Sequence, residues 1–108
     1  MAITLGTIVP RPDGFIQRSF SQSGAAGPET LIADPGDGSR AVIHSLVVSM
    51  SVTGTLALDG LTGAFDVVAG YPVELVGNAP IYNADSTVTT ITSATGAARG
   101  IVVYDIET

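Results

Sequence analysis

The chain of 108 residues contains no cysteine and no tryptophan. Without cysteine it can form no disulfide, and it offers no thiolate for zinc binding or nucleophilic catalysis. A domain of this length can bury a hydrophobic core of its own, so its stability does not require a covalent staple. The absence of cysteine fits a protein that stays in a reducing compartment.

Positive charge is also scarce. Lysine is absent, and four arginines stand against ten acidic residues, which gives a net charge of −6. Charged residues make up 13% of the chain, against about 25% in an ordinary globular domain. No basic patch is present that would attract a phosphate backbone, so we expect no nucleic-acid partner.

The sequence also lacks membrane and export signals. No apolar run approaches the roughly 18 residues that span a bilayer, and the first residues lack the basic start and apolar stretch of a signal peptide. We therefore expect no membrane partner and synthesis in the cytoplasm. Hydrophobic residues nevertheless make up 45% of the chain. An apolar surface with so few charges tends to aggregate unless it is covered, so the composition predicts that part of the surface is buried in an assembly.

Most of the sequence consists of segments that are typical of β-strands. Short β-branched runs alternate with turns rich in glycine, proline, asparagine and aspartate, and no segment keeps a helical period for ten residues. The longest run spans 40–52, and the last spans 101–106. This pattern predicts an all-β fold of about eight short strands, either a small jelly roll or an immunoglobulin-like β-sandwich. The spacing alone does not separate the two.

The first 39 residues are less regular than the rest. Their short strand candidates are interrupted by PRPDG, QSGAAGP and DPGDGS, which are turn and loop sequences. We expect residues 1–39 to form an N-terminal arm with short strands, and residues 40–108 to form the sandwich of a single domain. Within the sandwich, residues 77–80 are expected to form a loop.

The long strand predicts which side chains face the core. Successive side chains of a strand point to opposite faces, and the even-numbered positions from Val42 to Val52 are the more apolar set. Ile43 and Val47 then lie exposed among serines on the other face. The candidate interface consists of these two residues and four apolar residues of the N-terminal segment: Ile3, Leu5, Phe15 and Phe20.

Few residues could carry chemistry. His44 is the only histidine, and it shares the expected core face, so its adjacent Ser45 points the other way and forms no nucleophile–base pair with it. We interpret His44 as a packing residue. Asp34, Asp37 and Asp13 are the candidates for a cation site, although turn chemistry explains them without a cation. We therefore expect no catalytic residue, no metal and no cofactor, and thus no enzyme.

Tyr71 is the best candidate for binding a ligand by stacking. It lies in the loop sequence Gly-Tyr-Pro, and sugars bind to exposed aromatic rings on many β-sandwiches. An exposed Tyr71 beside Asn78, Asn83 or Asp85 would favour a carbohydrate-binding site. The alternative is a tyrosine that anchors its loop to the end of the sandwich.

From Ala41 to Tyr104 the chain resembles small β-sandwich proteins of tailed-bacteriophage virions. The resemblance rests on VIHSLVVSMSVTGTLAL, on VVAGYPVELVGNAPIYNADSTVTTITSAT and on ARGIVVYDIE. It implies a capsid decoration (cement) or head-fibre-base protein that binds the major capsid protein at repeated lattice sites on the capsid surface, with copies of this chain as a dimer or trimer. It implies no catalytic residue. The alternative is a carbohydrate-binding or adhesion module of a phage fibre or tail.

Overall fold

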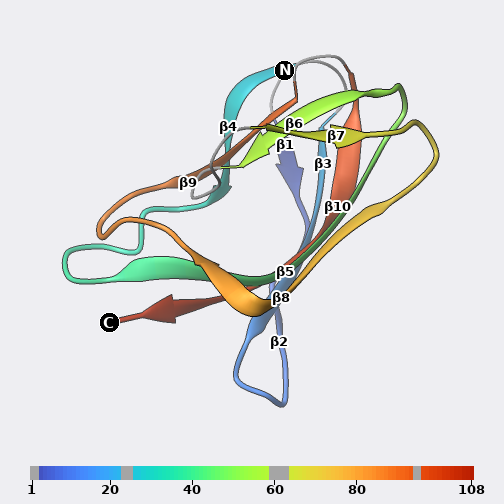
Figure 1. The fold of residues 1–108 in the computed structure, drawn as a ribbon. Coiled ribbons are helices and arrows are strands. Elements are labelled where there is room, and N and C mark those ends of the chain that lie inside the picture. Colours follow the sequence, from blue (N-terminus) through green and yellow to red (C-terminus); the bar gives the residue numbers. More distant parts are fainter. Residues whose placement is uncertain (1–2, 23–25, 59–63, 94–95) are drawn as a thin grey trace.

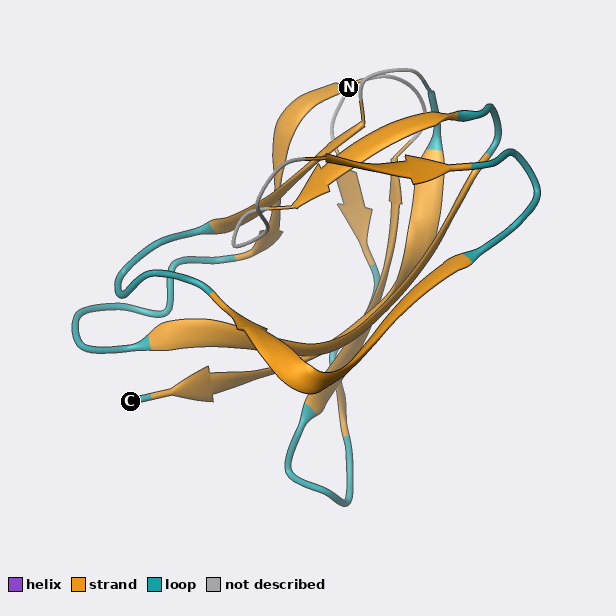
Figure 2. Ribbon diagram, viewed as in Figure 1, coloured by secondary structure: helices purple, strands orange, loops and turns teal. Residues whose placement is uncertain are grey.

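The computed structural model describes residues 3–22, 26–58, 64–93 and 96–108, and these form strands and loops without a helix (Figure 2). The strands are β1 (Ile3–Leu5), β2 (Val9–Pro10), β3 (Ile16–Gln22), β4 (Ala26–Ile32), β5 (Arg40–Met50), β6 (Gly54–Leu58), β7 (Ala64–Val67), β8 (Val73–Tyr82), β9 (Thr89–Ser93) and β10 (Ala98–Glu107). The all-β prediction is confirmed.

The strands form two antiparallel sheets that face each other (Figure 1). One sheet has the order β1-β3-β10-β5-β8, with β2 paired to β3, and the other has the order β4-β9-β6-β7. The pairs β3–β10, β4–β9, β5–β8 and β6–β7 are nested, so the chain is a long antiparallel hairpin rolled into two layers. That nesting is the jelly-roll topology. It decides between the two sandwich types that the sequence left open.

The N-terminal segment contributes strands to both sheets. β3 lies between β1 and β10 in the larger sheet, whereas β4 forms an edge of the smaller one. β2 belongs to a hairpin that projects from one end of the larger sheet (Figure 1). The residues expected to form an arm therefore complete the jelly roll, because they supply the first strand of two of the four nested pairs, β3–β10 and β4–β9.

The core fills the space between the sheets. Alternate residues of β9 and β6 face inward, and β10 contributes Ala98, Val102 and Tyr104 to the core cluster. Leu46, Val48 and Met50 of β5 are at most 4% exposed, which confirms the even-numbered face over this part of the strand.

A β-bulge at His44 reverses the alternation in β5. Tyr104 pairs with Ile43 and Val103 pairs with Ser45, so His44 is an extra residue in β5. Before the bulge the core residues are the odd-numbered Ala41 and Ile43. The prediction that Ile43 is exposed is therefore wrong, because the bulge changes the phase of the strand.

His44 itself lies outside the core. It is half-buried, and its ring stacks on Phe15 with centroids 3.9 Å apart and planes inclined by 10°. The placement of His44 on the core-facing set is corrected for the same reason as that of Ile43. The expected loop at 77–80 is also wrong, because β8 continues through it. The pairing of β8 with β5 is irregular opposite His44, because Ile81 pairs with Ile43 whereas the next pair is Val76 with Ser45.

The phase change can be tested by truncating the two side chains. Ile43→Ala removes buried atoms and should cost about 2–5 kcal/mol of unfolding free energy. His44→Ala removes only a stacking contact at the surface of the sheet and should cost no more than about 1.5 kcal/mol. Urea unfolding of the two variants measures both values. A larger loss for His44→Ala than for Ile43→Ala would contradict the bulge.

Gly100 marks a close approach between β10 and β5. A Cβ placed there would collide with the backbone carbonyl of Val47, which cannot rotate away as a side chain can. Gly6 provides the matched control, because a Cβ there meets first the Ser19 hydroxyl, which can turn aside. Gly100→Ala should destabilise the fold by about 2 kcal/mol or more, as overpacking does, and Gly6→Ala by clearly less. Equal losses in thermal unfolding would show that the strands separate easily at Gly100.

Candidate functional site

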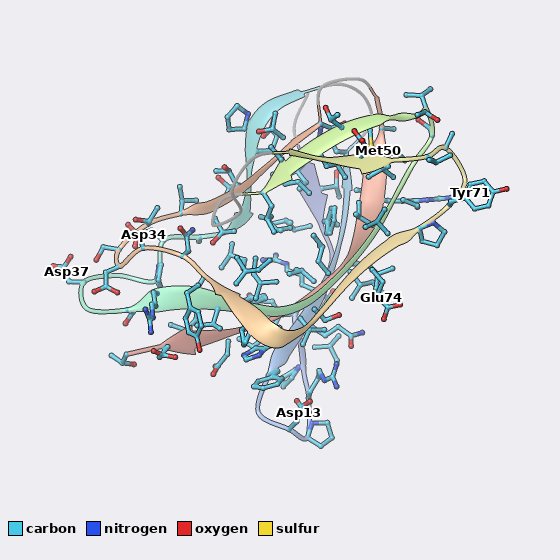
Figure 3. The ribbon with its side chains drawn as sticks, in the orientation of Figure 1. Asp13, Asp34, Asp37, Met50, Tyr71 and Glu74 are labelled. Atoms are coloured by element: carbon cyan, nitrogen blue, oxygen red, sulfur yellow. The ribbon has the colours of Figure 1, made fainter. Side chains whose placement is uncertain are left out.

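Two loops lie together at one end of the sandwich. The β5–β6 turn at 51–53 meets the β7–β8 loop at 68–72, and Figure 3 shows Met50 and Tyr71 at this end. The Gly70 amide donates a hydrogen bond to the Met50 carbonyl over 3.3 Å, and the Ala69 amide donates one to the Thr53 hydroxyl over 3.1 Å. Gly70 has a φ of +78°, a conformation that glycine adopts without strain.

These loops expose apolar side chains. Val52 is 44% exposed, Val68 53% and Tyr71 71%. We call these three residues the apolar tip. Residues 45–58 and 67–73 contain no ionisable residue except the Tyr71 phenol, so the tip is an uncharged apolar surface on a chain with a net charge of −6.

Two hollows lie next to the tip. The larger, of about 690 Å³, is lined on one side by tip-loop residues, including Ser51, Gly70 and Pro72. The smaller, of about 420 Å³, runs along the outer face of the six-stranded sheet past Val47 and Ile101. Four residues line both hollows, which therefore adjoin: Ser21, Ser49, Pro72 and Arg99.

The predicted interface residues differ in whether they are accessible to a partner. Phe20 and Ile43 are 3% and 4% exposed and belong to the core, so neither is available to a partner, and their prediction as interface residues is corrected. They are buried because both face the smaller sheet. Ile3 and Leu5 also pack against the core while remaining half-buried.

The other two predicted interface residues, Phe15 and Val47, lie outside the core. Phe15 covers His44 near the β2 hairpin, and Val47 is half-buried in the smaller hollow. Tyr71 belongs to the tip. The sequence did not indicate Val68, and it placed Val52 on the core-facing set, because nothing in it shows that β5 ends at Met50.

Tyr71 has no polar partner from the β8–β9 loop. Asn83 and Asp85 follow β8, whereas Tyr71 precedes it, and a strand of ten residues separates them by roughly 30 Å. Asn83 instead donates a hydrogen bond to the Thr89 hydroxyl over 2.9 Å. The side chain of Asn78 lies outside the described residues. The polar surroundings that would favour a sugar site are thus not formed by Asn83 and Asp85.

The candidate cation ligands serve their own turns. Asp34 accepts a hydrogen bond from the Gly36 amide over 2.8 Å, and Asp13 binds Arg11 over 2.9 Å. Asp13 lies on the β2 hairpin, far from Asp34 and Asp37 (Figure 3). Within the described ranges, no three His, Cys, Asp or Glu side chains come together as metal ligands would.

Charged groups pair at the opposite end of β5 from the tip. Arg40 binds Glu107 across the β5–β10 pair and lies over the Tyr82 ring, 4.5 Å from its centroid. The hydrogen bond to Glu107 raises the pKa of the Arg40 guanidinium above its ordinary value. Across the described part of the chain, no helix is long and apolar enough to cross a bilayer.

Comparison with known proteins does not place the chain in a family. No family model matches the chain, and no curated protein matches it. One solved structure, described as an RmlC-like cupin protein from Desulfovibrio desulfuricans, is similar at 16% identity and a TM-score of 0.44, over 94% of this chain and 81% of that one.

Proposed function

We propose that this protein is a non-enzymatic structural protein that docks through its apolar tip onto repeated sites of a protein lattice, as a capsid decoration protein does on a virion. The observation that carries the proposal is the grouping of Val52, Val68 and Tyr71 on two hydrogen-bonded loops without a charge among them. Large apolar side chains gathered at one end of a small domain are typical of interaction surfaces.

The energetics suit binding at many sites. Complete burial of a valine or a comparable apolar side chain contributes about 1.5–3 kcal/mol, and ordering costs subtract from that sum. Three such residues give modest affinity for one copy. A lattice compensates because many copies bind at once and because rupture of the shell must break every contact.

The charge distribution supports the same proposal. A net charge of −6 keeps free copies apart in solution, while the tip carries no charge that would have to be desolvated on docking. The jelly roll also holds the tip rigidly relative to the rest of the domain. One tip loop follows β5 and the other precedes β8, and these two strands pair with each other in the larger sheet, with β8 at its edge.

The tip can be tested on particles that carry the protein. Val68→Ser with Tyr71→Ser should weaken co-sedimentation with particles stripped of the native protein at least tenfold, because about 1.4 kcal/mol corresponds to a factor of ten. Val9→Ser is the matched control, since Val9 is 49% exposed on the β2 hairpin at the other end. Equal binding by the tip variant and wild type would refute docking through the tip. Unchanged thermal rupture of the particles after stripping would refute a stabilising role.

A carbohydrate-binding module is the second candidate, and the 71% exposure of Tyr71 is the observation that favours it. It predicts chemical-shift changes at residues 68–72 when a panel of glycans is added. We expect none, because Asn83 and Asp85 lie at the other end of β8 and cannot hold a sugar that stacks on the ring. A saturable shift that Tyr71→Ser abolishes would favour the sugar site over lattice docking.

A further inference from the structure

Arg99 differs from the other three arginines in having no acceptor among the described residues. Arg11 binds Asp13, Arg40 binds Glu107, and the Arg18 Nε donates a hydrogen bond to the Gly6 carbonyl over 2.8 Å. Arg99 is exposed on the outer face of the six-stranded sheet, because its neighbour Ala98 points into the core. Its guanidinium is therefore available to a ligand.

Hydroxyl groups flank Arg99 across four neighbouring strands. Arg99 pairs with Ser21 of β3 on one side and with Ser49 of β5 on the other, and Ser21 pairs in turn with Thr4 of β1. Residues directly opposite in antiparallel strands share a face, with Cβ atoms about 4.5–5.5 Å apart. The outer face thus carries a row of hydroxyls with a guanidinium in the middle.

This row lies where the two hollows adjoin. Arg99, Ser21 and Ser49 line both of them. The larger hollow, of about 690 Å³, falls within the range of about 300–1,000 Å³ that is typical of small-molecule sites. Its lining combines the polar row with apolar residues, namely Met50, Pro72, Ala97 and Ala98.

We propose that the Arg99 hollow binds a small organic acid, with the carboxylate on Arg99 and the flanking hydroxyls and an apolar body against Pro72 and Met50. The fork of the guanidinium matches the two oxygens of a carboxylate. A single positive charge on a chain of −6 favours a ligand with one negative charge over a phosphate. Glu74, opposite Val47 on the same face, opposes a second negative charge. This site goes beyond lattice docking and does not depend on it.

The test is a titration of the ¹⁵N-labelled protein with hexanoate, followed by amide chemical shifts. Hexanoate should shift the amides of residues 21, 49 and 97–99 saturably. Hexanamide, which keeps the body and loses the charge, should bind at least tenfold more weakly, and so should inorganic phosphate. Absence of a hexanoate shift at these amides, or equal binding of the amide, would overturn the proposal, and tighter binding of phosphate would overturn the assignment to a carboxylate.

Variants locate the site. Arg99→Gln should weaken hexanoate binding at least tenfold, and Arg99→Lys should recover only part of it because the planar fork is lost. Arg11→Gln is the matched control and should bind as wild type does, since Arg11 lies on the β2 hairpin, paired with Asp13. Hexanoate binding that survives Arg99→Gln would refute the site. Thermal unfolding checks each variant, and if Arg99→Gln fails to fold, the comparison of hexanoate with hexanamide on the wild type decides.

Discussion

The pairing of β5 with β10 is the constraint on which the rest of the structure depends. These two strands of the larger sheet pair along their whole length, from Met50 with Ala98 to Arg40 with Glu107. Their register requires a glycine at 100, where the backbones come close, and a bulge at His44. The registers of the adjoining pairs, β3 with β10 and β5 with β8, depend on this register. It fixes which face of β5 meets the smaller sheet, and therefore which side chains form the core.

The same register positions the surface features that we propose to be functional. β5 ends at Met50, so Val52 turns outward beside the loop that carries Val68 and Tyr71. On the outer face, Ser49 and Arg99 become neighbours because Met50 pairs with Ala98. A shift of one residue would turn both away from the solvent side. The apolar tip and the Arg99 hollow thus arise from one strand pair, and their different chemistry lets each be tested separately.

The sequence predicted the fold class correctly, but it predicted poorly which side chains of a strand face the core. Short β-branched runs between turn residues were sufficient to predict a sandwich, and alternation placed Leu46, Val48 and Met50 correctly. It failed at Ile43 because the sequence carries no signal for a bulge at His44, and the alternation changes phase there. Jelly-roll topology was beyond reach, since strand order depends on pairings between residues far apart in the chain.

The candidate site was predicted only at Tyr71, whose glycine and proline neighbours indicate an exposed turn. Val68 lies two residues after Asp66 and two before Gly70, and neither links it to Val52, because the contact between their loops is tertiary. The sequence did not indicate a site at Arg99 either. Only the structure shows that the other three arginines have acceptors and that Arg99 has none among the described residues. Surface function here depends on which loops and strands meet, and a single sequence does not record that.

The central claim is that the apolar tip is the docking surface. Hydrogen–deuterium exchange, measured on the protein free and bound to the particles that carry it, tests the claim most directly. The account predicts slower exchange on binding at the amides of residues 51–53 and 68–71, with the β2 hairpin unchanged. Protection confined to the β2 hairpin, or none at the tip, would contradict it.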